Sequence, residues 1–216
     1  MKLIIFGATG LTGLELVSQA IDEGHSVTAF VRNPNTMNIQ HLNLKVVNGD
    51  ILEYDLVQAA VQGQEVVLSV LGVNSFKKNS IISDGTQNII RAMNEHSTMR
   101  FICVTTMGLG DSKNQKGWAY IMPISLMFRI QRIPILRNQF IDRELQEDHI
   151  KKSTLDWIIV RPGGLTNGPR TGNYKHGFSI EDTTVKAQIS RADVADFMLK
   201  QIADDTYLQK TPSLSY

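Results

Sequence analysis

The chain has 216 residues, of which 42% are hydrophobic and 20% are charged, a composition typical of a soluble protein with a sizeable core. The formal net charge of +1 gives no reason to expect nucleic acid or an anionic membrane as a partner. The single cysteine, Cys103, excludes an intramolecular disulfide and a cysteine metal cluster, and the 5 histidines lack metal-ligand spacing, so we expect no metal site. No signal peptide precedes the first predicted strand and no apolar run approaches the ~18 residues of a membrane span, so we expect a cytoplasmic protein.

The N-terminal residues predict a strand, a glycine turn and a helix, in that order. An apolar run at 3–6 is typical of a strand buried on both faces, and apolar residues then recur at helical spacing, at Leu11, Leu14, Val17, Ala20 and Ile21. Between them, Gly7 would allow a tight turn, Gly10 the close approach of a pyrophosphate, and Gly13 the packing of helix on strand. Because a helix N-terminus offers unpaired N–H groups, the turn predicts dinucleotide binding. The alternative is a structural turn in another kind of α/β protein.

The second strand, Ser26–Val31, ends at a basic residue. In dinucleotide enzymes this strand end meets the adenosine ribose, where an acidic residue accepts from the 2′-hydroxyl and a basic residue suits a 2′-phosphate. Arg32 therefore predicts a preference for NADP(H) over NAD(H). The alternative is that Arg32 is only a solvated surface charge.

Two more strand ends carry candidate cofactor residues. Residues 44–47 predict a third strand, and Asp50 follows it, where its carboxylate could accept from the adenine amino group or cap a helix beginning near Glu53. Residues 66–70 predict a fourth strand. Gly72 follows it and would let the backbone lie flat against the cofactor, or would serve as a plain turn glycine.

The rest of the chain continues this alternation. We predict a helix at 80–96, strands at 101–104 and 157–160, a helix at 135–152, a short strand at 183–187, and a last helix capped by Ser190, with a polar tail from Thr206. An insertion at 113–134 interrupts the pattern, and we interpret it as a lid, a pocket wall, a homodimer interface or plain core. The alternation predicts one Rossmann-like α/β domain over residues 1–216, with a doubly wound, mostly parallel sheet.

Five segments together carry a family resemblance: GATGLTG (7–13), VRNP (31–34), GDI (49–51), LDWIIVRPG (155–163) and SRADVA (190–195). They resemble the atypical short-chain dehydrogenase/reductase group with NAD(P)-binding, NmrA-like domains, and within it the flavin reductase/biliverdin-IXβ reductase type. The resemblance covers nearly the whole chain and implies an NADPH-dependent reductase. The cofactor contacts that it implies are Gly7, Thr9, Gly10, Leu11, Thr12, Arg32, Asp50, Leu71 and Gly72. We add to this predicted cofactor site Gly13, Ile51, Thr105, Arg143 and Pro162.

The chain departs from the wider family at the reactive end. Typical short-chain dehydrogenases use Tyr-x-x-x-Lys to pass a proton to a carbonyl oxygen, but no tyrosine here has a lysine four residues later, and Arg143 occupies the lysine position. Where the flavin reductase group has a serine and a histidine, this chain has Thr106 and Gly164. We therefore predict Thr106 as the catalytic residue, orienting nicotinamide or acceptor, against the alternative of a strand-capping hydroxyl. Arg143 and Glu147 lie one helical turn apart and form an ion pair or contact the ligand.

Two functions follow from these residues. The first is an NADPH-dependent oxidoreductase acting on a flat, electron-poor small molecule of the flavin or quinone type, which needs little acid catalysis because solvent can protonate the product. The second is a regulator that binds NADP(H) and reports redox state to a partner protein without turnover. The missing Tyr/Lys pair and the Met-rich insertion are compatible with this second function.

Overall fold

A mostly parallel sheet forms the centre of the protein, seen here in a computed structural model that describes residues 1–72, 80–110, 112, 134–179 and 181–216. The six predicted parallel strands are present as β1 (Lys2–Phe6), β2 (Ser26–Val31), β3 (Leu44–Asn48), β4 (Val66–Ser69), β5 (Arg100–Val104) and β6 (Asp156–Pro162). β10 (Ser213–Ser215) lies parallel to β6, and β8 (Lys175–His176) lies antiparallel to β10. The order β3-β2-β1-β4-β5-β6-β10-β8 confirms the predicted doubly wound, Rossmann-like α/β fold.

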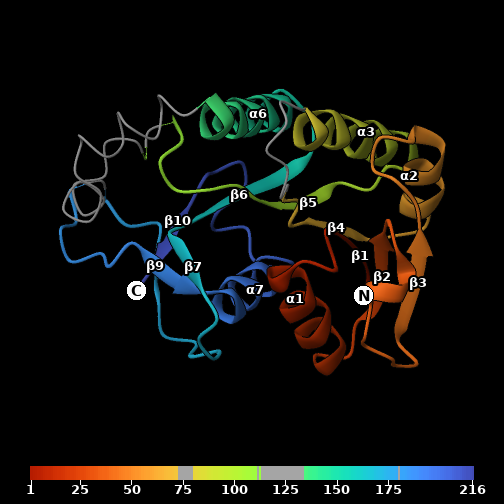
Figure 1. The fold of residues 1–216 in the computed structure, drawn as a ribbon, viewed down its shortest axis with the longest axis horizontal. Coiled ribbons are helices and arrows are strands. Elements are labelled where there is room, and N and C mark those ends of the chain that lie inside the picture. Colours follow the sequence, from red (N-terminus) through yellow and green to blue (C-terminus); the bar gives the residue numbers. More distant parts are fainter. Residues whose placement is uncertain (73–79, 111, 113–133, 180) are drawn as a thin grey trace.

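Helices cover both faces of this sheet (Figure 1). On one face lie α1 (Leu11–Asp22) and α7 (Arg191–Lys200), and on the other lie α2 (Tyr54–Val61), α3 (Ile81–His96) and α6 (Pro134–Lys151). Central strands buried in this way need apolar residues on both sides. The four residues from Leu3 to Phe6 are accordingly all 0% exposed, which explains why β1 shows a continuous apolar run and not an alternating pattern.

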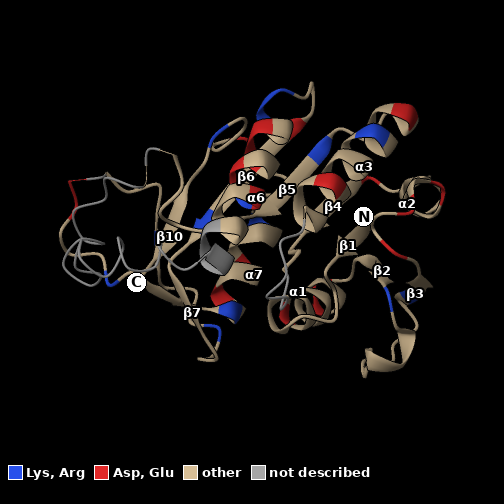
Figure 2. Cartoon of the chain, turned by 45° about the horizontal axis from the view of Figure 1, so that its top comes forward, with Lys and Arg blue, Asp and Glu red and all other residues tan. Residues whose placement is uncertain are grey.

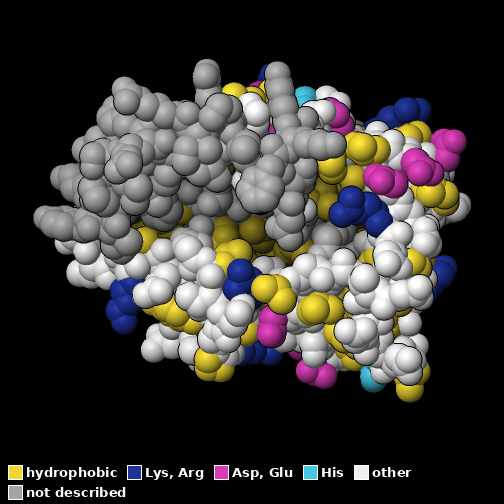
Figure 3. Space-filling view, viewed as in Figure 1, with side chains coloured by type: hydrophobic (Ala, Val, Ile, Leu, Met, Phe, Trp, Pro, Cys, Tyr) yellow, Lys and Arg dark blue, Asp and Glu magenta, His cyan; other side chains and the backbone are white. Residues whose placement is uncertain are grey.

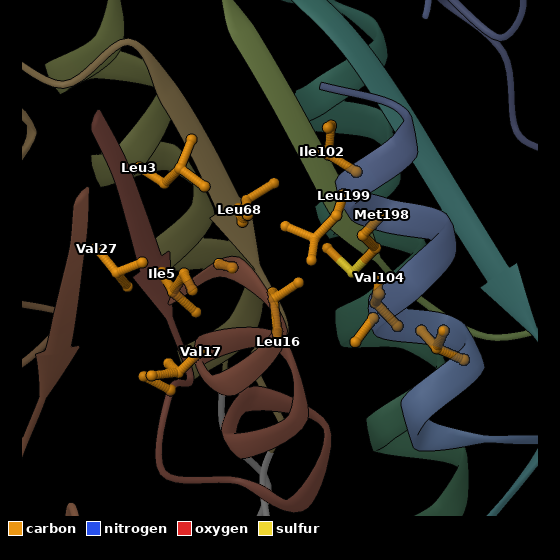
Figure 4. Packing of buried hydrophobic residues seen from close by; sticks show 14 of the residues in the cluster. Leu3, Ile5, Leu16, Val17, Val27, Leu68, Ile102, Val104, Met198 and Leu199 are labelled. Carbon is orange, nitrogen blue, oxygen red and sulfur yellow. The ribbon is translucent and has the colours of Figure 1, made fainter. Parts of the chain in front are cut away.

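The core on the α1/α7 face connects the two halves of the sheet (Figure 4). Residues of β1, β2, β4 and β5 pack there against residues of both helices: Leu3, Ile5, Val27, Leu68, Ile102 and Val104 from the strands, and Leu16, Val17, Met198 and Leu199 from the helices. Ser190 caps α7 as predicted, its hydroxyl accepting from the Asp193 amide at 3.0 Å. This packing fixes the strand ends relative to one another.

One prediction for the C-terminal part is wrong, and the polar tail contains a strand that was not predicted. The short strand expected at 183–187 lies instead at β9 (Gln188–Ser190), which pairs with β7 (Gly164–Thr166) as a separate sheet. Ala187 has a φ of 51°, which is not an extended conformation. The tail after Thr206 contains β10, whose Leu214 is 0% exposed. A strand of three residues gives no periodic signal, so its burial depends on β6 and β8 beside it.

Charged residues of both signs are distributed over the described elements, as Figure 2 shows for α3, which carries Asp84, Arg91 and Glu95. This mixture agrees with the small net charge of the sequence. In the described part of the chain, no helix is long and apolar enough to cross a membrane.

We predict that Leu214→Ala lowers the free energy of unfolding by about 2–5 kcal/mol, because it leaves a cavity beside β6. Leu42→Ala is the matched control, since Leu42 is 91% exposed, and should change stability by less than about 0.5 kcal/mol. Denaturant unfolding of both variants measures the difference. Equally small changes in the free energy of unfolding of the two variants would contradict the packing of β10 in the core.

Candidate functional site

The carboxyl ends of the parallel strands lie at one edge of the sheet. The chain leaves β1 for β2 and leaves β3 for β4, while β1 lies between β2 and β4, so the strand order reverses beside β1. Ligands of open α/β sheets bind in the crevice at such a reversal. The topology therefore brings the segments after β1 to β4, which carry most of the predicted cofactor residues, to one place. In Figure 3, hydrophobic side chains lie in a hollow near the middle of the viewed face.

Sterics require glycine at two positions of the turn after β1. Gly7 has a φ of 81°, and a Cβ added there would lie 2.6 Å from the carbonyl oxygen of Val70, just beyond β4. A Cβ added at Gly13 would lie 2.2 Å from the carbonyl oxygen of Gly7. The tight turn and the close helix packing expected from these two glycines are both present.

Gly10 differs because its open side faces the edge of the sheet. It is exposed, is the N-cap of α1, and provides no side chain to cap the helix. Within the described residues, the amides of Leu11, Thr12 and Gly13 have no hydrogen-bond partner, and the first turn of α1 holds no acidic residue. Leu11 is 58% exposed, so the inward position expected from the helical pattern is wrong for this residue. The positive end of α1 is therefore available to a phosphate.

Arg32 directly follows β2 and is exposed. Among the residues that the structure describes, its guanidinium has no hydrogen bond or ion pair. The next residue, Asn33, accepts from the Asn35 amide at 3.1 Å and caps the short helix η1 (Pro34–Thr36), which fixes the loop. Arg32 thus presents an uncommitted cation at the strand end where the adenosine ribose of a dinucleotide lies.

Asp50 caps a turn and not a helix. Its Oδ1 accepts from the Leu52 amide at 3.0 Å, whereas α2 begins at Tyr54 with Glu53 as its N-cap. The second carboxylate oxygen, Oδ2, has no partner within the described chain, so it can still accept from an adenine amino group. Ile51 is 6% exposed and anchors this turn in the core.

The segment after β4 opens toward the same edge. Leu71 is partly buried against the core on the α2/α3 face, and Gly72 is exposed. A Cβ added at Gly72 would meet no atom within 4 Å, so the described residues do not require glycine there. The chain at 73–79 lies outside the described residues, as do residues 113–133 of the insertion predicted at 113–134.

Two threonines with different surroundings follow β5. Thr105 is 3% exposed, and its hydroxyl donates to Oε1 of Glu147 at 2.9 Å. Thr106 is partly buried, and its hydroxyl donates to the carbonyl oxygen of Met107 at 3.2 Å. Thr106 is therefore the more accessible hydroxyl at this strand end, and Thr105 belongs to the buried network around Glu147.

Glu147 of α6 forms a buried ion pair with Arg161 of β6. Arg161 donates through Nε at 2.9 Å and through Nη2 at 2.6 Å, and Lys151 donates at 2.8 Å. Glu147 is 3% exposed and Arg161 is 1% exposed. Burial by itself would raise the pKa of the Glu147 carboxyl, but the hydrogen bonds and charges of Arg161 and Lys151 outweigh it and hold the pKa below 4.5. The ion pair that the sequence allowed between Arg143 and Glu147 is absent from the described interactions.

Arg143 and Pro162 each contact the segment that follows β5. Arg143 is partly buried, and its Nη1 lies 3.5 Å from the carbonyl oxygen of Thr105. Pro162 is buried, and its carbonyl oxygen accepts from the Met107 amide at 2.9 Å. Gly164, which stands where the family histidine is expected, is exposed in β7. These residues surround the ends of β5 and β6, and β4 separates them from the glycine turn after β1.

Cys103 is buried in β5, as predicted. Burial raises the pKa of its thiol to about 12, so it is not a nucleophile at neutral pH. Among the described residues, no group of three or more His, Cys, Asp or Glu side chains is arranged to hold a metal ion.

The sequence analysis missed two residues that shape the site. Arg161 lies beneath Gly110, whose φ is 54° and where an added Cβ would lie 2.6 Å from Nη2 of Arg161. Asp142 is 4% exposed and accepts from the amides of Ile82 and Ser83, which begin α3. The available signal was a charged residue directly after the apolar strand 157–160, and polar residues one turn apart on one helix, at Asp142 and Gln146.

We predict that Glu147→Gln lowers the free energy of unfolding by about 3–5 kcal/mol at neutral pH, because it removes a buried counter-charge of the Arg161 cation. Asp148→Asn is the matched control on the same helix, since Asp148 pairs with Lys152 at the surface, and its effect should stay below about 1 kcal/mol. Denaturant unfolding of both variants provides the measurement.

We also predict that the effect of Glu147→Gln on the free energy of unfolding depends on pH. The folded-state pKa of Glu147 lies below its ordinary value of 4.5, so its stabilisation is fully present above 4.5 and is lost as the pH falls through the folded pKa. The stability difference between the wild type and Glu147→Gln should therefore be constant above this value and shrink in acid. A difference that does not change in acid would refute the ionised pair.

Comparison with known proteins agrees with this geometry. The sequence matches the family described as NAD(P)H-binding over residues 7–205. The Arabidopsis thaliana protein At2g34460, described as uncharacterized and chloroplastic, is 27% identical over 213 residues, 94% of this chain and 72% of that protein. ChuY from Escherichia coli O157:H7, described as an anaerobillin reductase, has a TM-score of 0.78 at 24% identity over 100% of this chain and 97% of that chain. A short-chain dehydrogenase/reductase from Veillonella parvula, solved in complex with NADP, has a TM-score of 0.74 at 20% identity over 100% and 94% of the two chains. The two structural likenesses concern the fold, and the family match, which spans most of the sequence, shows that this chain belongs to the NAD(P)H-binding family.

Proposed function

We propose that the protein is an NADPH-dependent oxidoreductase that transfers hydride to a flat, electron-poor acceptor of the flavin or quinone type. The observation that carries the proposal is the uncapped N-terminus of α1 at Gly10, placed where the strand order reverses. Unpaired amides, an uncompensated helix dipole and no obstructing side chain suit a pyrophosphate. The described residues therefore fit the dinucleotide that the family binds.

The residues at the ends of different strands would bind different parts of the cofactor. Gly10 and the amides of Leu11 and Thr12 would hold the pyrophosphate after β1, and Thr9 lies in the same turn. Asp50 after β3 would accept from the adenine through its unpartnered Oδ2. The segment of Leu71 and Gly72 after β4 would lie along the nicotinamide half, since it leaves the sheet on the other side of β1.

The preference for NADP(H) rests on Arg32. An exposed arginine without a carboxylate partner in the described chain suits the 2′-phosphate, because a planar guanidinium donates two parallel hydrogen bonds to a phosphate. The Veillonella relative was solved with NADP, which supports the same choice.

At the nicotinamide end of the site, the main role of the protein would be to position the two reactants and not to donate a proton. Bound NADPH supplies the hydride, and solvent supplies the proton that completes the reduced acceptor. Thr106, at the end of β5, would orient the nicotinamide or the acceptor through its hydroxyl. Holding the two rings in contact is the main contribution required, and it favours acceptors that are already electron-poor. ChuY, described as a reductase of anaerobillin, supports a flat acceptor.

The test is to mix purified protein with NADPH and a panel of flavins and quinones, and to follow the near-ultraviolet absorbance of the reduced nicotinamide. We expect acceptor-dependent loss of absorbance well above the uncatalysed rate. Tight NADPH binding without turnover of any acceptor would contradict the enzyme and favour the redox-sensing regulator instead.

The cofactor preference has its own prediction. Arg32→Asp should weaken NADPH binding by at least about tenfold while changing NADH binding much less, because it replaces a phosphate partner with a repulsive charge. Dissociation constants for the two nucleotides, measured by quenching of protein fluorescence, check this outcome. Equal weakening of NADPH and NADH binding would show that Arg32 does not bind the 2′-phosphate.

A further inference from the structure

Arg143 is a partly buried cation without a carboxylate partner in the described chain. Its single hydrogen bond there is the 3.5 Å contact from Nη1 to the carbonyl oxygen of Thr105. Two carboxylates act on its charge from nearby, Asp142 and Glu147. Burial lowers the pKa of the Arg143 guanidinium, because the charged form is poorly solvated there.

Both nearby carboxylates are engaged elsewhere. Asp142 accepts from the amides of Ile82 and Ser83 at 3.1 and 3.0 Å, at the beginning of α3. Glu147 accepts from the Thr105 hydroxyl, from Lys151 and twice from Arg161. A partly buried cation whose two nearby carboxylates both have other partners is stabilised when an anion binds to it.

The position of Arg143 in the fold indicates where that anion comes from. α6 leads into β6 and packs on a parallel sheet, so it runs antiparallel to the strands and its N-terminal half lies toward their carboxyl ends. Arg143 is one turn closer to that edge than Glu147, which itself holds Thr105. The guanidinium therefore lies beside the end of β5, next to the predicted catalytic Thr106.

The phosphate groups of the cofactor would bind in another part of the strand order, beside β1 and β2. The pyrophosphate site is the turn after β1, and the 2′-phosphate site is Arg32 after β2, whereas Arg143 lies beside β5, two strands away from β1. Two strand spacings of ~4.8 Å separate the turn after β1 from the end of β5 by about 10 Å, and Arg32 lies one strand farther away. A reduced nicotinamide carries no negative charge, so the dinucleotide offers no anion at this end.

We infer that Arg143 binds a carboxylate of the acceptor, which makes the acceptor a flat anionic molecule and Arg143 its specificity-determining residue. This inference rests on the proposed function and differs from the cofactor contact that the sequence suggested for Arg143. A planar guanidinium suits this role, because it donates two parallel hydrogen bonds to a carboxylate and keeps its charge when partly buried.

The experiment compares two probes with the same ring, naphthoate and its neutral amide, naphthamide, titrated by calorimetry into the protein saturated with NADP⁺. We expect the wild type to bind naphthoate at least about tenfold more tightly than naphthamide. Arg143→Gln should abolish this preference, and Arg143→Lys should retain part of it. An unchanged affinity for NADP⁺ in both variants shows that they are folded.

Lys152→Gln is the matched control, since Lys152 is an exposed cation just after the C-terminus of α6 and pairs with Asp148. It should keep the full preference for naphthoate. Equal binding of both probes to the wild type, or a preference that survives Arg143→Gln, would overturn the inference. Weaker NADP⁺ binding by Arg143→Gln would also overturn it, by assigning Arg143 to the cofactor.

The inference and the proposed function fail in different ways. If the protein reduces a neutral quinone with NADPH but shows no preference for naphthoate, the proposed oxidoreductase activity stands and the inference of an anionic acceptor is wrong. A naphthoate preference in a protein that reduces no acceptor would overturn the acceptor assignment, because the anion would then be an effector of a non-catalytic protein.

Discussion

The carboxylate of Glu147 connects three elements of the site through hydrogen bonds and ion pairs. It receives the Thr105 hydroxyl from the end of β5, the Arg161 guanidinium from β6 and Lys151 from its own helix. Arg161 in turn lies directly beneath Gly110, which leaves no room for a side chain there. This buried ion pair therefore links the backbone after β5, the end of β6 and α6 to one another.

That ion pair also decides how charge is distributed at the reactive end. Arg161 is 1% exposed and has little access to water, so the loss of a buried carboxylate partner would cost it several kcal/mol, whereas Arg143 is only partly buried. The carboxylate consequently pairs with Arg161, although Arg143 lies one helical turn away. The cation left over lies at the open edge, where a ligand can reach it. The structural requirement of the core thus leaves an anion-binding group in the site.

The strands and turns that carry the predicted cofactor residues could be predicted from the sequence because the signals there are local. The strand, the glycine turn and α1 follow one another within the first 22 residues, and Arg32 directly follows β2. The surroundings of Glu147 were not predictable in this way, since Arg161 lies on the next element of the chain and meets the carboxylate only because α6 packs against β6. The same limit applies to β10, whose residues form a strand because β6 and β8 lie beside it, and to Ala187, whose φ of 51° follows from tertiary packing.

The residues at the end of β5 also limit the chemistry open to the proposed enzyme. An arginine stays protonated in proteins, so Arg143 can stabilise negative charge but cannot give a proton to a substrate oxygen. The Thr106 hydroxyl is a very weak acid, and no tyrosine in this sequence has the lysine partner that would make it an efficient one. These residues are therefore poorly suited to ketone reduction, which needs a proton during hydride transfer. Flavins and quinones spread negative charge over their rings when they accept hydride, and for them a fixed cation near the ring edge is the more useful group.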